Sequence, residues 1–82
     1  MNQRAAFRET VQLARDREMP ALPGSSVGLD HLQSMWARAE GSFSDAKLGR
    51  WLGWAQCAVV ASGVASLDEM KAINVKWSAD VA

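Results

Sequence analysis

The chain has few of the residues that build disulfide frameworks, metal centres or β-sheets. Its 82 residues include one cysteine, Cys57, one histidine, His31, and no tyrosine. A single cysteine excludes an internal disulfide, and no spaced set of cysteine and histidine of the kind that holds zinc is present. With seven Val, one Ile and one Thr, β-branched residues are also scarce, so the sequence disfavours a β-sheet fold.

A net charge and a long apolar run are missing as well. Nine Lys and Arg residues balance nine Asp and Glu residues, so the chain has no overall field that would attract nucleic acid or an anionic membrane. The longest apolar stretch, residues 51–64, is broken by glycine, glutamine and serine and is too short to cross a bilayer. Because 49% of the residues are apolar, disorder is not expected either. We predict a single cytoplasmic domain with one modest core.

Residues that favour helices dominate the sequence instead, above all Ala, Leu, Met, Arg, Glu and Gln. We predict four helices, at residues 3–17, 29–40, 45–62, and from 67 to between 77 and 79. Side chains that cap helix ends support these limits: Asn2 and Ser44 as N-caps, Gly63 as a left-handed stop, and a capping box formed by Ser66 and Glu69. For the second helix, Ser26 or Asp30 is the expected cap and Gly41 the expected stop.

Apolar residues at helical spacing predict one buried stripe on each helix. These are Ala6, Phe7, Thr10, Val11, Leu13 and Ala14 in the first helix; Leu32, Met35, Trp36 and Ala39 in the second; Leu48, Trp51, Leu52, Ala55 and Val59 in the third; and Leu67, Met70, Ile73 and Trp77 in the fourth. The third helix has a second face of mostly small residues, made by Gly49, Gly53 and Val60, with Cys57 at its edge. Two glycines at this spacing suggest that another element packs closely there.

The expected fold is all-α, a small bundle of four helices with the third helix central. We expect residues 1–82 to form one domain whose parts differ in how firmly they pack. Residues 28–78 are expected to form a compact helical unit. Residues 1–18 form a first helix that either docks across this unit or is partly free, on a linker at residues 19–27 rich in Pro, Gly and Ser.

No set of residues suited to catalysis, metal binding or cofactor binding stands out. His31 has no second histidine or carboxylate cluster to complete a metal site, and we interpret it as a solvated surface residue. Cys57 has no nearby cysteine, and we expect it to be buried as a small apolar residue. The glycines do not match a phosphate-binding loop. The sequence therefore predicts a protein that is not an enzyme.

Trp54 is the most informative side chain for function, because it lies off both packing faces of the third helix. On a helical wheel it falls near Lys47 and Arg50. Trp and Arg are enriched at the energetic centres of protein interfaces, and Arg50 is placed for a cation–π contact with Trp54. Two interpretations stay open: the first helix covers Trp54, or Lys47, Arg50 and Trp54 bind a protein partner or a second copy of the chain.

A stripe of arginines on the first helix supports the alternative function. Arg4, Arg8 and Arg15 share one helix face and could contact phosphates, although Glu9 and Asp16 dilute the positive charge. The alternative hypothesis is therefore a nucleic-acid-associated regulator that uses this stripe. A helix–turn–helix in the second and third helices is disfavoured, because the third helix presents Trp, Leu, Gly and Ala where a reading helix shows polar side chains.

Two segments carry a resemblance to a group of small proteins. The runs from Phe43 to Gln56 and from Ser66 to Asn74 resemble segments of small helical proteins encoded by bacteriophages and prophages. That group has no assigned activity, so the resemblance implies no functional residue. It implies a bacterial cytoplasm and an accessory phage role. Together with Trp54, which lies off both packing faces of the third helix, this predicts a small non-enzymatic interaction protein.

Overall fold

The computed structural model describes residues 1–39, 41 and 43–78, and that part of the chain contains four α-helices. They are α1 (Gln3–Asp16), α2 (Leu29–Arg38), α3 (Asp45–Ser62) and α4 (Leu67–Ser78). The predicted all-α fold of four helices is therefore confirmed. The expected end of the second helix at residue 40 lies outside the described residues. None of the described helices is long and apolar enough to span a membrane.

The predicted caps set the ends of three helices. The side chains of Asn2 and Ser44 each accept a hydrogen bond from the amide three residues further on, at 3.0 and 3.2 Å. Ser66 and Glu69 form the predicted reciprocal capping box, with bonds of 3.0 and 3.1 Å. Gly63 ends α3 with a φ of 85°, a conformation in which a Cβ atom would be strained. Local sequence alone explains these ends.

The start of α2 is built differently from the prediction. Gly28 is its N-cap, and no side chain caps the helix. Instead, the amides of Leu29 and Asp30 donate to the carbonyl oxygens of Pro20 and Ala21, at 2.9 and 3.3 Å. A Cβ atom at position 28 would lie 2.2 Å from the Ala21 oxygen. Glycine is therefore required there, because the backbone of the linker itself covers the first turn of α2.

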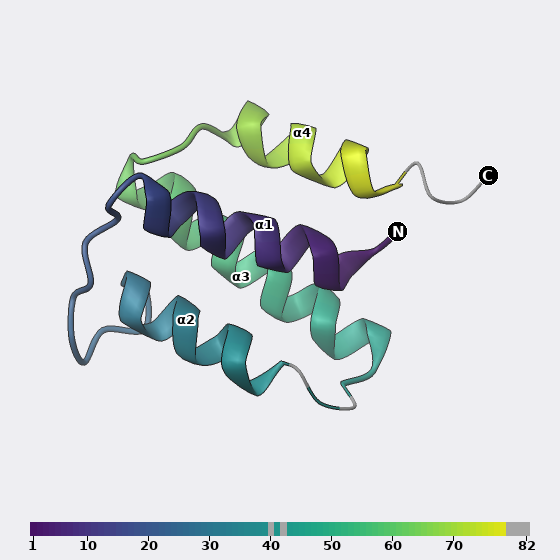
Figure 1. Cartoon of the computed structure of the whole chain (residues 1–82), viewed down its shortest axis with the longest axis horizontal. Coiled ribbons are helices and arrows are strands. Elements are labelled where there is room, and N and C mark those ends of the chain that lie inside the picture. Colours follow the sequence, from purple (N-terminus) through teal and green to yellow (C-terminus); the bar gives the residue numbers. More distant parts are fainter. Residues whose placement is uncertain (40, 42, 79–82) are drawn as a thin grey trace.

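The central helix is α1 rather than α3. Figure 1 shows α1 in front of α3, with α4 along one side and α2 along the other. α1 contacts all three other helices, whereas α2 packs chiefly on α1. The expected central position of the third helix is thus taken by the first, which is docked. Among the helices of the expected compact unit, α3 contacts α4, whereas α2 packs chiefly on α1.

The core collects one large buried side chain from each helix. Phe7, Leu32, Val59 and Met70 are almost fully buried. Small residues on α1, including Ala6 and Ala14, are completely buried and allow the neighbouring helices to approach closely. Most of the predicted stripes are buried or half-buried. The exception is Leu67, which is 59% exposed.

A polar network ties α1, α3 and α4 together within this core. The Gln56 side-chain amide donates to the Thr10 hydroxyl at 3.2 Å and to the Asn74 oxygen at 2.9 Å. Asn74 donates back to Gln56 at 3.0 Å, and Thr10 donates to the Ala6 carbonyl at 2.8 Å. Among the described residues, no buried side-chain nitrogen or oxygen lacks a partner. A fully satisfied network of this kind favours one register among the three helices.

Candidate functional site

Two grooves flank α3, one on each side, and they are the candidate sites. The first, here the α2/α3 groove, has a volume of about 450 Å³. It is lined by His31, Met35 and Arg38 from α2 and by Arg50, Trp51 and Trp54 from α3. The groove is open because α2 and α3 both pack on α1 more than on each other.

Positive charge gathers around the α2/α3 groove. The Arg38 guanidinium lies 5.5 Å from the centre of the Trp51 ring, and the Lys47 ammonium lies 5.6 Å from the same centre. Lys47 is also 4.2 Å from the Phe43 ring, which packs on Trp51 in a T-shaped arrangement with 4.8 Å between centroids. The Trp51 ring is therefore occupied by neighbours from within the chain, and it holds two cations at the groove.

Trp54 is the exposed aromatic residue of this groove. Its side chain is 47% exposed. Its indole N–H donates to the carbonyl oxygen of Ser26 at 3.0 Å. The linker, and not α1, thus holds the indole, so the interpretation that the first helix covers Trp54 is wrong. The bond fixes one edge of the ring and leaves much of the indole in contact with solvent.

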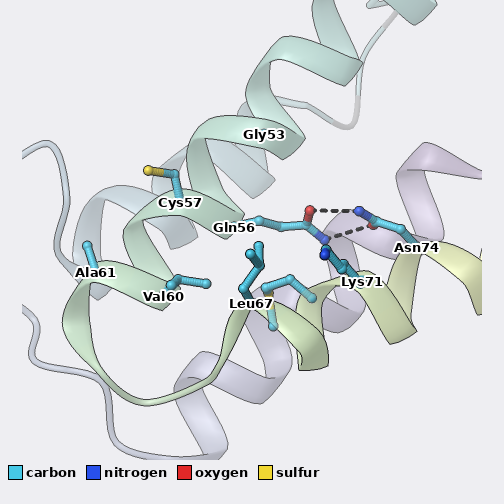
Figure 2. Close-up of a pocket in the computed structure, with 9 residues that line it drawn as sticks. Gly53, Gln56, Cys57, Val60, Ala61, Leu67, Lys71 and Asn74 are labelled. Atoms are coloured by element: carbon cyan, nitrogen blue, oxygen red, sulfur yellow. Dashed lines mark hydrogen bonds between the residues drawn. The ribbon is translucent and has the colours of Figure 1, made fainter.

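The second groove, here the α3/α4 groove, has a volume of about 390 Å³ and a different character. Its walls come from Gly53, Cys57, Val60 and Ala61 of α3 and from Leu67 and Lys71 of α4. Figure 2 shows the Gln56–Asn74 amide pair joining the two helices at this groove. The amides bond to each other, so they offer little to a ligand.

The small-residue face of α3 is largely uncovered. Cys57 is exposed, against the expectation of a buried residue. A Cβ atom built on Gly53 meets nothing within 4 Å. At Gly49 it would lie 2.5 Å from the side-chain oxygen of Gln3. The predicted close approach therefore occurs at Gly49, where α1 crosses, and not at Gly53.

The arginine stripe of α1 is split by the fold. Arg4 donates to the carbonyl oxygens of Ala39 and Gly41, the latter at 3.3 Å, and so covers the end of α2. A cation in this position satisfies carbonyl groups that a helix end leaves unpaired. Arg8 and Arg15 remain exposed, beside Trp36. Three arginines that share one face in sequence thus provide two cations for an outside ligand.

Cations on the far side of the molecule are paired with carboxylates. Arg17 binds Glu69 and Lys76 binds Glu9, the second pair at 2.9 Å. The hydrogen bond from Arg17 lowers the pKa of Glu69 from its ordinary value of 4.5 to about 2. The bond from Lys76 likewise lowers the pKa of Glu9. Neither ion pair involves a residue of the α2/α3 groove.

Sequence reasoning identified two of the six residues that line this groove. It identified Arg50, Trp54 and the nearby Lys47, which are on or beside the groove. It missed Arg38 and Met35, and it interpreted His31 as a solvated surface residue, whereas His31 is half-buried in the wall. Helix periodicity gives the face of each helix but not which faces meet, so no local signal could have joined α2 residues to α3 residues.

The arrangement suits binding more than chemistry. In the described residues, no group of three His, Cys, Asp or Glu side chains could hold a metal ion. His31 lines the α2/α3 groove, and no serine, threonine or cysteine is among the described residues that line it. Comparisons found no matching protein-family model, no matching curated protein and no matching solved structure.

Proposed function

We propose that this is a small non-enzymatic interaction protein that binds a protein partner through the α2/α3 groove. The observation that carries the proposal is Trp54, an indole 47% exposed beside Arg50 and Arg38. A large exposed aromatic ring with flanking guanidinium groups is typical of the energetic centre of a protein interface. An aromatic ring held at one edge by Ser26 loses little conformational freedom on binding.

The sequence resemblance and the position of Arg4 support the same proposal. The resemblance of residues 43–56 and 66–74 to phage- and prophage-encoded proteins favours a bacterial cytoplasmic protein whose partner is a host protein. The alternative, a nucleic-acid regulator acting through α1, is weakened because Arg4 is bound to Ala39 and Gly41. Loss of one cation from a stripe of three lowers the electrostatic attraction to phosphates.

The test is retention of proteins from a bacterial lysate on the immobilised chain. Wild type, Trp54→Ala and the control Arg15→Gln are compared, and circular dichroism reports whether each variant is folded. We expect Trp54→Ala to stay folded and to lose the retained protein, because half of the indole is already in water. A truncated hot-spot residue costs about 2 kcal/mol of binding or more, about thirtyfold in affinity.

Two results would contradict the proposal. One is an unfolded Trp54→Ala, which would make Trp54 a core residue. The other is a retained protein that the substitution does not affect. Light scattering after size exclusion separates a foreign partner from self-association. A wild-type dimer that becomes a folded monomer with Trp54→Ala would show that the occupant of the groove is a second copy.

A further inference from the structure

The chemistry of the α2/α3 groove also indicates what kind of partner it fits. The chain as a whole is neutral, yet the charged side chains at this groove are the cations Arg38, Lys47 and Arg50. Arg38 and Lys47 lie over one ring, at 5.5 and 5.6 Å from its centre. Both cations thus lie at the Trp51 ring that lines the groove, where together they attract a carboxylate.

Several cations outside the α2/α3 groove have partners within the chain, and the two arginines of the groove differ from them. Arg17 and Lys76 each bind a carboxylate of the same chain, and Arg4 binds two carbonyl oxygens. In the described part of the chain, the ion pairs include neither Arg38 nor Arg50. Both guanidinium groups are exposed and retain donors for the two oxygens of an incoming carboxylate.

The apolar part of the groove adds a second requirement. The exposed half of Trp54 lies on the same wall as Arg50, and the buried side chain of Met35 lies opposite, on α2. An aromatic ring and a thioether favour an apolar side chain. A fitting ligand thus carries negative charge and an apolar group within a length comparable to α2, which has 10 residues.

From these contacts we infer that the groove recognises a short acidic protein segment with one large apolar side chain. Arg38 and Arg50 bind its carboxylates, and Trp54 receives the apolar side chain. This inference rests on the proposed function and narrows it. A segment lying between two helices follows the usual mode of peptide recognition in a helical groove.

Single-stranded nucleic acid is the competing anionic ligand, and the rings disfavour it. Such ligands bind by stacking successive bases on free aromatic faces. The Trp51 ring contacts Arg38, Lys47 and the Phe43 ring, which leaves Trp54 as the ring of this groove available for stacking. One ring anchors one side chain well, but it cannot hold a run of bases.

The test is a selection of displayed random peptides of about 12 residues, a length that matches a helical groove ligand, on the full-length protein. Four proteins are compared: wild type, Trp54→Ala, the double variant Arg38→Gln/Arg50→Gln, and the control Arg8→Gln/Arg15→Gln. The control removes the same charge from exposed α1 residues. The best peptide is then synthesised with its Glu and Asp residues intact or replaced by Gln and Asn, and each form is titrated by fluorescence anisotropy.

We expect the enriched peptides to be acidic and to contain a large apolar residue. Their affinity should fall at least about tenfold with Arg38→Gln/Arg50→Gln, as for loss of charge-assisted hydrogen bonds, and by less than about twofold with the control pair, whose charges lie outside the groove. The neutral form of the peptide should lose a similar factor on the wild-type protein. That comparison uses no variant, so it holds even if the double variant is poorly folded.

Other results distinguish failure of the acidic partner from failure of the proposed function. Peptides that need Trp54 but are neutral or basic would overturn the acidic partner and leave the proposed function standing. Absence of any peptide that depends on Trp54 or on the two arginines would overturn both. Binding of a thymidine 12-mer that exceeds peptide binding, and that the double variant abolishes, would replace the acidic segment with nucleic acid.

Discussion

The two grooves beside α3 differ in what their polar groups bind. At the α3/α4 groove, Gln56 and Asn74 bond to each other, and Gln56 also bonds to Thr10. At the α2/α3 groove, the ion pairs found among the described residues include neither Arg38 nor Arg50, and Trp54 stays half in solvent. One side of the helix thus uses its polar groups to hold the fold, and in the proposed function the other side offers them to a partner. Stability and binding should therefore respond to different substitutions on the same helix.

Gly28→Ala tests the groove on the α2 side and should have the largest effect. The new Cβ atom would lie 2.2 Å from the Ala21 carbonyl oxygen, which is backbone and cannot move alone. Overpacking of this kind costs about 1–3 kcal/mol or more, and it displaces the linker whose Ser26 holds Trp54. Urea unfolding measures the loss, and partner binding should weaken too. Gly41→Ala is the control, with its nearest neighbour at 4.0 Å.

Gln56→Ala tests the opposite groove. The substitution leaves Thr10 and Asn74 without their partner and should lower the free energy of unfolding by about 1–3 kcal/mol. Affinity for a ligand of the α2/α3 groove should not change while the protein is folded. Gln12→Ala on the exposed face of α1 is the matched control. Equal stability of Gln56→Ala and wild type would remove the structural role given to the amide pair.

The same substitution at two glycines of α3 should change stability by different amounts. Gly53→Ala should stabilise the protein more than Gly49→Ala. Gly53 has open space, so alanine should stabilise α3 by up to about 1 kcal/mol. At Gly49 the new Cβ atom meets Gln3, whose amide bonds to the Asp45 carbonyl at 2.9 Å. Loss of that bond should cancel most of the gain. Thermal unfolding of both variants measures the difference in stability. A larger gain in stability at position 49 would show that the contact between Gln3 of α1 and α3 is loose.

Acid should weaken the ion pairs of the molecule by protonating their carboxylates. The arginines of the α2/α3 groove have no such carboxylate among the described residues. The pKa of Glu69 is lowered to about 2 by its hydrogen bond from Arg17, against an ordinary 4.5. Its contribution to stability is therefore present above pH 4.5 and is lost as the pH falls from there toward 2. Melting temperature against pH should fall over this range, and less steeply for Glu69→Gln. Identical curves would mean that the exposed ion pair adds no stability.

The Cys57 thiol gives the smallest expected effect, since its modification should change neither stability nor binding. Because the residue is exposed, a disulfide reagent should label the folded protein within about tenfold of its rate in denaturant. The labelled protein should keep its affinity at the α2/α3 groove. Labelling that requires unfolding would show that another surface, such as a second copy, covers the α3/α4 groove.

Sequence predicted the local features of this fold and missed the ones that depend on distant pairing. The limits of α3 follow from Ser44 and Gly63, and both were predicted. The start of α2 was not, because its partners are the Pro20 and Ala21 carbonyls of a linker whose path no local pattern gives. Capping is decided within about four residues, whereas such backbone contacts need the folded chain.

The same limit explains the candidate site. Trp54 was singled out because its position on a helical wheel needs no knowledge of other helices. Exposure of Leu67 and Cys57 could not be predicted, because an apolar residue faces solvent only when no helix happens to cover it. Arg38 was missed for a related reason: its importance comes from meeting Trp51 across two helices.

The central position of α1 determines how the molecule can open. α3 and α4 touch each other as well as α1, but α2 relies chiefly on α1, on the linker backbone and on Arg4. We therefore expect release of α1 to coincide with global unfolding, and α2 to open locally at a lower free energy. Such an opening would leave the Gln56 network, which joins α1, α3 and α4, intact. On this expectation the α3 wall of the α2/α3 groove is the firmer one, and the α2 wall is the first to move.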